Sequence, residues 1–173
     1  MLPINLDLRR FPLLLVGPTG EVVERERQLR GAGCERLTPV PCNSLPNPAA
    51  SDALPAHRLL MVCAKDLPGT ETLVQQAREH GLVTWVEDRR EWCDFHLPAL
   101  VRRGDLSFAI STGGRSPALA GILRRHLERL FPESWSQHLD EIAALRARLR
   151  SERALPEQIH RATEALIARE QWL

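Results

Sequence analysis

The sequence lacks the cysteine spacing that holds a metal ion. Its four cysteines, Cys34, Cys42, Cys63 and Cys93, form no CxxC pair and show no zinc-like spacing. We therefore expect reduced thiols in a cytoplasmic protein, and the sequence leaves any metal unknown.

Long apolar runs and an excess of charge are also missing. The run Leu13–Val16 near the N-terminus is too short for a signal peptide or a membrane span. The formal net charge is only +1, from 23 basic and 22 acidic residues. Such a balance makes no electrostatic case for binding to nucleic acid or to a membrane, and we expect neither as a partner.

Lysine is nearly absent, because Lys65 is the only one and the other 22 basic residues are arginines. Genomic base composition is one explanation. Carboxylate recognition is another, since a guanidinium group binds planar anions with two parallel hydrogen bonds.

The first two thirds of the chain alternate between apolar runs and polar helical segments. Apolar runs typical of buried strands lie at 12–16, 59–64, 82–86 and 106–111, and helical segments lie at 21–30 and 70–80. The proline-rich stretch 38–55 reads as a loop. This alternation predicts an α/β fold with a Rossmann-like, mostly parallel, doubly wound sheet.

After Gly113 and Gly114 the pattern becomes helical only. Ser116 followed by Pro117 is typical of a helix start, and further helices are expected from about Ser134 and Pro156. The first helix carries an apolar stripe of Leu119, Ile122, Leu123, Leu127 and Leu130, which indicates either core or a dimer face. We therefore place a Rossmann-like domain at 1–112 and a helical dimerisation and C-terminal region at 113–173.

Three segments carry candidate chemistry. The loop Gly17-Pro18-Thr19-Gly20 stands where a dinucleotide-binding protein has GxGxxG, although Thr19 replaces the second glycine and Pro18 lacks an N–H. A structural left-handed turn at Gly20 is the alternative.

The acids Glu87, Asp88 and Asp94 follow the third apolar run, where a carboxylate can act as a general base or simply cap a helix. The third segment is Ser111-Thr112-Gly113-Gly114-Arg115 with Ser116, an anion site at a helix start or a helix cap alone.

Two stretches of the chain resemble the precorrin-2 dehydrogenase family, which also forms the N-terminal part of siroheme synthases. They run from Trp92-Cys93-Asp94-Phe95 to Ala99, and from Arg102 through the Ser111-Thr112-Gly113-Gly114 loop to Ala120. The likeness extends over nearly the whole chain, including the opening residues and the helical tail.

The resemblance implies a homodimer that oxidises precorrin-2 to sirohydrochlorin with NAD⁺, and in some members also inserts ferrous iron. It implies that Asp88 is the essential aspartate and that Gly17, Pro18, Thr19 and Gly20 hold the cofactor. Arg103 and the loop of Ser111, Thr112, Gly113 and Gly114 match positions at the active-site cleft. On chemical grounds Arg115 and the pair Arg89–Arg90 are further partners for substrate carboxylates.

Three departures from the family pattern fall on the nucleotide side. The family has three glycines where this chain has Gly17-Pro18-Thr19, and Thr-Asp-Asp where it has Lys65-Asp66-Leu67. The segment between Gly33 and Leu59 is short, as though a helix were lost. Two main hypotheses follow: an active NAD-dependent dehydrogenase, or a tetrapyrrole-binding or chelatase-type relative that has lost NAD. A protein-interaction module is a third.

Overall fold

The computed structural model describes residues 3–173 and divides into two compact units, Met1–His96 and Leu97–Leu173. The division falls at His96, whereas the sequence led us to expect it after Thr112.

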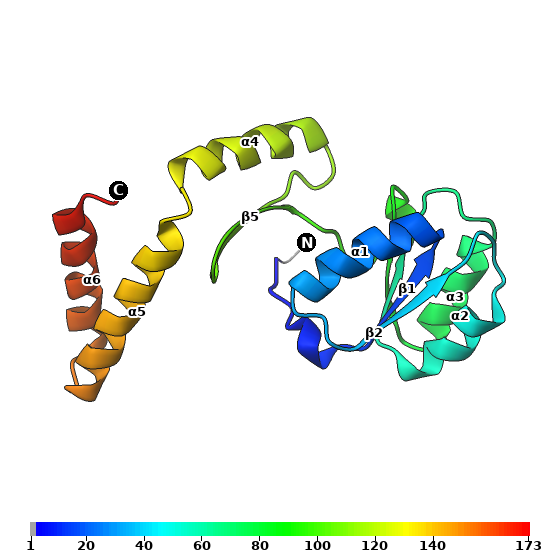
Figure 1. Ribbon diagram of the computed structural model, residues 1–173, viewed down its shortest axis with the longest axis horizontal. Coiled ribbons are helices and arrows are strands. Elements are labelled where there is room, and N and C mark those ends of the chain that lie inside the picture. The colour runs from blue at the N-terminus through cyan, green and yellow to red at the C-terminus, as the bar shows by residue number, and fades with distance from the viewer. Residues whose placement is uncertain (1–2) are drawn as a thin grey trace. The chain divides into compact units, whose positions relative to one another are not determined.

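The first unit is built on a four-stranded parallel sheet in the order β2-β1-β3-β4 (Figure 1). The strands are β1 (Leu13–Gly17), β2 (Leu37–Pro41), β3 (Leu59–Val62) and β4 (Val83–Val86). The helices are α1 (Thr19–Gly31), α2 (Pro48–Ala53) and α3 (Thr70–Glu79), with short 3-10 turns at Leu8–Arg10, Leu54–Ala56 and Arg90–Trp92. The predicted α/β fold is confirmed.

Alternation of side chains along the strands gives this sheet two apolar faces. On one face Leu14, Val16, Leu60, Val62 and Val86 pack against α2 and α3. On the other face Leu13, Leu15, Leu59, Met61 and Trp85 pack with Val22 and Leu29 of α1. Burial on both faces explains why β1 and β3 read as continuous apolar runs.

The expected loop at 38–55 was wrong, because this stretch contains β2 and α2. Strand β2 includes Pro39 and Pro41 and lies at the edge of the sheet, where a missing backbone N–H breaks no ladder on the open side. Helix α2 begins at Pro48, and the Asn47 side chain accepts a hydrogen bond from the Ala49 amide at 3.0 Å. Proline here starts structure rather than interrupting it.

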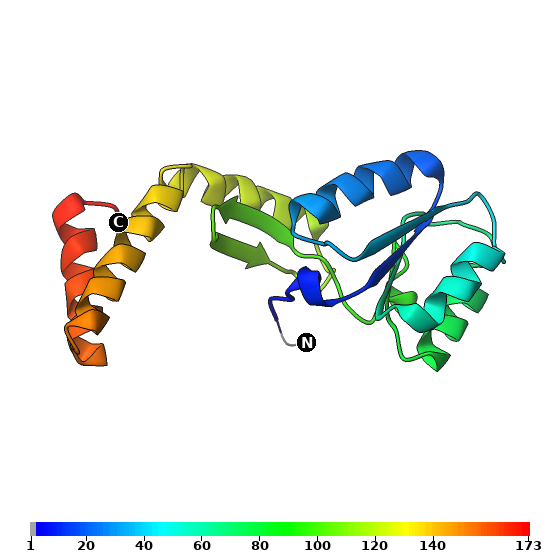
Figure 2. The same ribbon diagram turned by 60° about the horizontal axis from the view of Figure 1, so that its bottom comes forward.

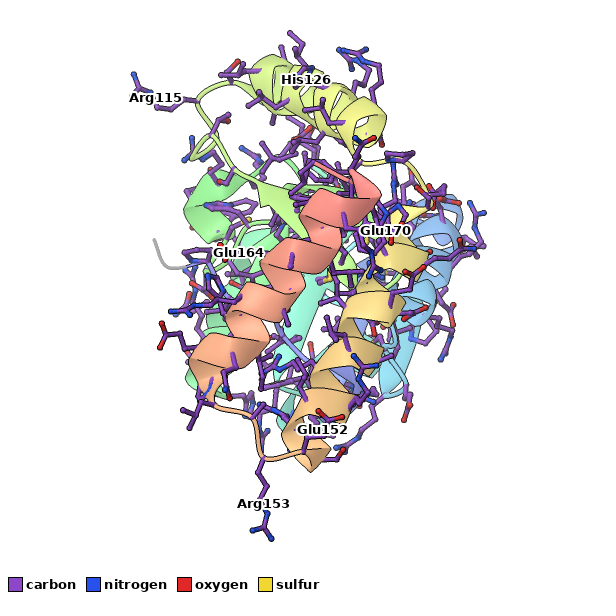
Figure 3. All side chains as sticks on the ribbon, turned by 90° about the vertical axis from the view of Figure 1, so that its left-hand side faces the viewer. Arg115, His126, Glu152, Arg153, Glu164 and Glu170 are labelled. Carbon is purple, nitrogen blue, oxygen red and sulfur yellow. The ribbon has the colours of Figure 1, made fainter. Side chains whose placement is uncertain are left out.

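The second unit contains a hairpin and three helices. Strands β5 (Ala99–Arg103) and β6 (Leu106–Ile110) pair antiparallel, and α4 (Pro117–Leu130) packs on them (Figure 2). Helices α5 (Trp135–Ser151) and α6 (Pro156–Glu170) lie side by side (Figure 3). Rings of Phe108, Phe131, Trp135, His138 and Trp172 form a continuous aromatic cluster, with His138 and Trp172 stacked at 4.1 Å.

The strand predicted at 106–111 is confirmed as β6, but its expected place in the mostly parallel sheet was wrong. A parallel connection usually crosses over through an α-helix, whereas only Gly104 and Asp105 join β5 to β6, which pair antiparallel. The fourth strand of the parallel sheet is β2 instead. The helices expected from about Ser116, Ser134 and Pro156 are confirmed as α4, α5 and α6.

Candidate functional site

The turn after β1 has the geometry expected of a tight strand-to-helix connection. Gly17 has φ +152°, and a Cβ atom there would lie 3.4 Å from the backbone and the Cβ of Cys63. The contact itself leaves room for a Cβ, but L residues with a side chain rarely adopt this φ. The backbone conformation therefore favours glycine at the first position of the loop.

The next three residues start α1. Pro18 is the N-cap, and its carbonyl accepts the first helical hydrogen bond from the Val22 amide at 3.0 Å. The amides of Thr19, Gly20 and Glu21 precede that bond and point out of the helix end, where they can donate hydrogen bonds to an anion. Gly20 is helical, so the alternative of a left-handed turn there was wrong.

A pocket of about 400 Å³ runs along α1 within the first unit. It is lined by Gly20, Glu21, Glu24, Arg25 and Gln28 of α1 together with Cys63 and Glu87, which follow β3 and β4. Ligands of open α/β sheets bind at this end of the strands. Its surface around Gly20 is open, since a Cβ at Gly20 would meet no atom within 4 Å.

Arg25 and Glu87 form an ion pair on the pocket wall, with Nη2 and Oε2 2.7 Å apart. The Arg25 guanidinium also lies 5.0 Å from the centre of the Trp85 ring. Cys63 lies deeper, and burial raises the pKa of its thiol to about 11, although the nearby Arg25 acts in the opposite direction. No motif in the sequence singles out Arg25, although the helical period places it on the same face as Glu21 and Gln28.

Asp88 directly follows Glu87 and lies on the surface. Its backbone is left-handed, with φ 54°, and the Glu87 amide just before it donates to the Val62 carbonyl at 3.0 Å. Such a conformation is uncommon for a residue other than glycine and points to a constrained segment. Asp88 does not start a helix, so helix capping does not explain it.

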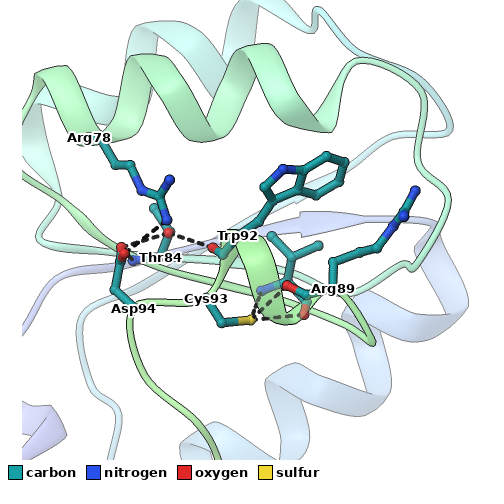
Figure 4. Close-up of polar contacts among 7 residues, drawn as sticks. Arg78, Thr84, Arg89, Trp92, Cys93 and Asp94 are labelled. Carbon is teal, nitrogen blue, oxygen red and sulfur yellow. Dashed lines mark hydrogen bonds and ion pairs between the residues drawn. The ribbon is translucent and has the colours of Figure 1, made fainter.

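The Cys93-Asp94 motif fastens the segment after Asp88 back onto β4 (Figure 4). The Asp94 carboxylate accepts hydrogen bonds from the Thr84 amide at 2.9 Å and the Thr84 hydroxyl at 2.7 Å, and pairs with Arg78 at 2.9 Å. The Cys93 sulfur lies 3.2–3.3 Å from the amide and carbonyl of Val86. The motif therefore acts as a clamp that holds both ends of the Asp88 segment together.

The clamp also sets the charge state of Asp94. Partial burial favours the neutral acid, but the hydrogen bonds from Thr84 and Arg78 outweigh it and lower the pKa of the Asp94 carboxyl. Glu87, Asp88 and Asp94 consequently do not form one acidic cluster: Glu87 pairs with Arg25, Asp94 with Arg78, and Asp88 is left at the surface.

Arg89 is held by residues of its own segment and by the loop that follows β3. Its guanidinium stacks 4.9 Å from the Trp92 ring centre, lies 3.5–3.6 Å from Asp66 and Glu91, and donates to the Lys65 carbonyl at 3.2 Å.

Arg103 is buried, with 8% exposure, and completes the end of α4. Its guanidinium donates to the carbonyls of Phe131 at 2.6 Å, Glu128 at 3.2 Å and Arg102 at 2.8 Å, and pairs with Glu133 at 3.0 Å. Carbonyls at the end of a helix lack intrahelical partners, and a basic side chain is well suited to satisfy them. These contacts account for the burial of Arg103, and its expected contact with substrate stays a prediction.

The loop from Ser111 to Arg115 is a tight turn ahead of α4. Gly113 and Gly114 have φ 60° and 74°, and the Arg115 amide donates to the Thr112 carbonyl at 3.1 Å. The Ser116 hydroxyl accepts from the Leu119 amide at 3.2 Å, as predicted for an N-cap. The Arg115 side chain extends away from the ribbon and is exposed (Figure 3).

Two structural findings bear on cofactors and location. Within residues 3–173, no group of three or more His, Cys, Asp or Glu side chains is arranged to hold a metal ion. None of the helices in this described range is both long and apolar enough to cross a membrane.

Known proteins resemble this chain in sequence. A family model described as "Sirohaem biosynthesis protein central" matches residues 103–130. Siroheme synthase 1 of Aeromonas salmonicida is 37% identical over an alignment 165 residues long, which covers 87% of this chain and 34% of that protein. Siroheme synthase of Methylococcus capsulatus is 32% identical over an alignment 172 residues long, which covers 90% of this chain and 35% of that protein.

A solved structure supports the fold. That of SirC, precorrin-2 dehydrogenase, superposes with a TM-score of 0.66 at 18% identity and covers 96% of this chain and 89% of its own. The chain spans about a third of the length of the curated relatives it matches. From the family model and the relatives, we conclude that the chain belongs to the siroheme synthase family, and the solved structure shows the shared fold.

Proposed function

We propose that the chain acts in siroheme biosynthesis and oxidises precorrin-2 to sirohydrochlorin with NAD⁺. The observation that carries the proposal is Asp88, a carboxylate that the clamp of Cys93 and Asp94 holds at the carboxyl end of β4, next in sequence to the pocket residue Glu87. Acid–base residues of α/β proteins lie at this end of the sheet.

The oxidation removes one hydride and one proton from the tetrapyrrole. NAD⁺, when bound, supplies the hydride acceptor. The Asp88 carboxylate accepts the proton, and its exposed position lets it reach a substrate that approaches from solvent. The left-handed backbone at Asp88 and the clamp behind it limit the movement of this carboxylate, which keeps it aimed at one site.

The first unit carries features that fit a dinucleotide. Gly17 makes the tight turn, and the amides of Thr19, Gly20 and Glu21 at the start of α1 suit a phosphate group. The open surface at Gly20 lets a phosphate approach the backbone. The Thr19 hydroxyl offers an additional hydrogen-bond donor.

The second unit carries candidates for substrate binding. The tetrapyrrole is a polycarboxylate, and residues 97–173 hold twelve basic and nine acidic side chains, a net charge of +3. We propose that Arg115 and the loop of Ser111, Thr112, Gly113 and Gly114 contact its carboxylates, since Arg115 is exposed at the start of α4.

Self-association is part of the proposal. Helix α4 exposes Leu119, Ile122, Leu123 and Leu130, with exposed fractions of 39–56%, along one helical stripe. Exposed apolar stripes of this kind mark protein–protein contacts. We propose that a second copy of the chain covers this stripe and forms a homodimer.

A tetrapyrrole-binding or chelatase-type relative without NAD is the second candidate. Three observations favour it: Pro18 removes one amide from the phosphate site, Thr19 replaces the second glycine, and Cys42 and Asn43 follow the end of β2, where NAD-binding sheets place an acid for the ribose. The two candidates differ in the role of Asp88: only the first requires its carboxylate as the base in the oxidation of precorrin-2.

Two measurements test the proposal. Calorimetry with NAD⁺ on the full chain and on Thr19→Gly is expected to show micromolar binding, and tighter binding in the variant. Binding that appears only with glycine, or in neither protein, would favour the relative without NAD.

The second measurement is precorrin-2 turnover by Asp88→Asn, which is expected to fall about a hundredfold or more because a positioned base is lost. Glu91→Gln removes another exposed acid of the same segment and is expected to leave turnover unchanged. Equal turnover by Asp88→Asn and the unaltered protein would reject the assigned role of Asp88.

A further inference from the structure

Arg25 is the one basic side chain among the described residues that line the pocket along α1. It lies on the same face of α1 as Glu21 and Gln28 and shares the pocket wall with Gly20, whose amide belongs to the phosphate-binding helix start. Its side chain is 24% exposed, so part of the guanidinium already faces the solvent-filled space.

The acids of the pocket differ in how they are neutralised. Glu24 pairs with Arg27 and accepts a hydrogen bond from Gln28 at 2.8 Å, both on the surface of α1. The charge of Glu87 is neutralised by its ion pair with Arg25. Arg25 is therefore the cation that an incoming anion would have to share with Glu87.

The start of α1 is a weakened phosphate site, because Pro18 removes one amide donor and Thr19 adds a side chain where close approach is needed. Glu21 in the first turn adds a negative charge near the same helix end. A dinucleotide bound here therefore requires another source of positive charge within the pocket.

We propose that Arg25 is a phosphate-binding residue of this pocket. In the absence of ligand Arg25 stays paired with Glu87, and a dinucleotide phosphate then replaces the Glu87 carboxylate. This inference rests on the proposed binding of NAD⁺. A guanidinium group donates charge-assisted hydrogen bonds to carboxylates and to phosphates alike, so a phosphate oxygen can take the place of Glu87 Oε2, which now accepts from Arg25 Nη2 at 2.7 Å. Stacking on Trp85 holds the guanidinium plane in place during the exchange.

The exchange connects cofactor binding to the catalytic segment. Glu87 is bonded through its amide to Val62 and is followed directly by Asp88. Release of the Glu87 carboxylate from Arg25 places a free negative charge beside Asp88 only when the cofactor is bound. Arg25 thus binds the cofactor and Glu87 opposes it.

This arrangement predicts effects of opposite sign at the two ends of one ion pair. Arg25→Gln removes the phosphate partner and is expected to weaken NAD⁺ binding about ten- to hundredfold, the range of a charged hydrogen-bonded contact. Glu87→Gln frees Arg25 and removes a repelling charge, and is expected to strengthen binding about two- to fivefold, the range of a partly exposed ion pair. Arg25→Lys keeps the charge without the planar fork and is expected to bind with intermediate affinity.

The test is calorimetric titration of NAD⁺ into the full chain and these three variants, with thermal unfolding of each apo protein. Arg30→Gln is the matched control, since Arg30 lies on the same helix and pairs with Glu26, and neither residue lines the pocket; its affinity should equal that of the unaltered chain.

Two results would overturn the inference in different ways. If the unaltered chain binds NAD⁺ and both Arg25→Gln and Glu87→Gln leave the affinity unchanged while lowering the unfolding temperature alike, the ion pair is only structural and the proposed function survives. If neither the unaltered chain nor Thr19→Gly binds NAD⁺, the inference and the cofactor half of the proposed function fall together.

Discussion

Polar side chains at the predicted sites have different roles in the two units. In residues 1–96, Arg25 and Glu87 line a pocket and Asp88 is exposed at the end of β4. In residues 97–173, the arginine expected to bind substrate, Arg103, is buried against backbone carbonyls. A residue that matches a family motif can therefore be a candidate for catalysis, as Asp88 is in the first unit, or stabilise the end of a helix, as Arg103 does in the second.

The apolar surfaces differ in the same way. The parallel sheet of the first unit is covered by helices on both faces, whereas α4 of the second unit leaves a stripe of leucine and isoleucine exposed. Charge differs too, with a net −2 from eleven basic and thirteen acidic residues in the first unit and +3 in the second. The first unit buries the apolar faces of its sheet within itself, whereas the second leaves exposed the stripe that we propose a second copy covers.

Arg103→Ala has the largest expected effect on this comparison, because it tests whether Arg103 stabilises the end of α4 or binds substrate. Loss of the guanidinium leaves several buried carbonyls without donors, so we expect the free energy of unfolding to fall by about 3 kcal/mol. Chemical denaturation followed by tryptophan fluorescence measures this. Arg102→Ala, at an exposed neighbour, is expected to change it little, and a stable Arg103→Ala protein with lost tetrapyrrole binding would contradict the structural role.

Ile122→Glu tests the open apolar surface of the second unit. A charge in the middle of the α4 stripe opposes burial there, so we expect the dimer dissociation constant to rise about thirtyfold, or about 2 kcal/mol. Light scattering over a dilution series gives this constant. Val23→Glu introduces the same charge at an exposed apolar position of α1 in the first unit and is expected to have no effect; a monomeric unaltered chain would reject the dimer.

Asp94→Asn tests the clamp of the first unit. The variant loses charge-assisted hydrogen bonds to Thr84 and Arg78, and because Asp94 is partly exposed we expect a loss of only about 1 kcal/mol at neutral pH.

The effect of Asp94→Asn depends on pH in a defined direction. Since the folded pKa of Asp94 is lowered, its contribution is present above the ordinary aspartate pKa and disappears as pH falls through the lower folded value. Urea unfolding at pH 7 and pH 3 measures the difference, with Asp66→Asn as an exposed control. A difference that persists at pH 3 would show that shape, not charge, matters.

Cys63 gives the smallest effect. Its thiol has a pKa raised to about 11 by burial and is 3% exposed, so iodoacetamide at pH 8 should modify it more slowly than the half-buried Cys42. Because the folded pKa exceeds the unfolded value, its contribution to stability is present below about pH 9 and is lost as pH rises toward 11. Peptide mass mapping over time follows both thiols, and equal rates would contradict the burial.

Several elements could be read from the sequence because their signals are local. Strand β1, helix α1 and the Ser116-Pro117 start of α4 follow from apolar runs, helical periodicity and capping residues. Strand β2 was missed because Pro39 and Pro41 normally exclude a strand, and only its place at the sheet edge makes them harmless.

The residues of the candidate site also fall into two groups, those that the sequence identifies and those whose role only the structure reveals. Sequence alone determined the family, the glycine turn at Gly17 and the choice of Asp88, because each depends on residue types at short spacing. Only the tertiary structure decided that Arg103 caps α4, that Asp94 clamps a segment and that Arg25 meets Glu87 across 62 positions of chain. Hydrogen bonds between distant segments depend on how strands and helices pack, and no local pattern in a single sequence contains that information.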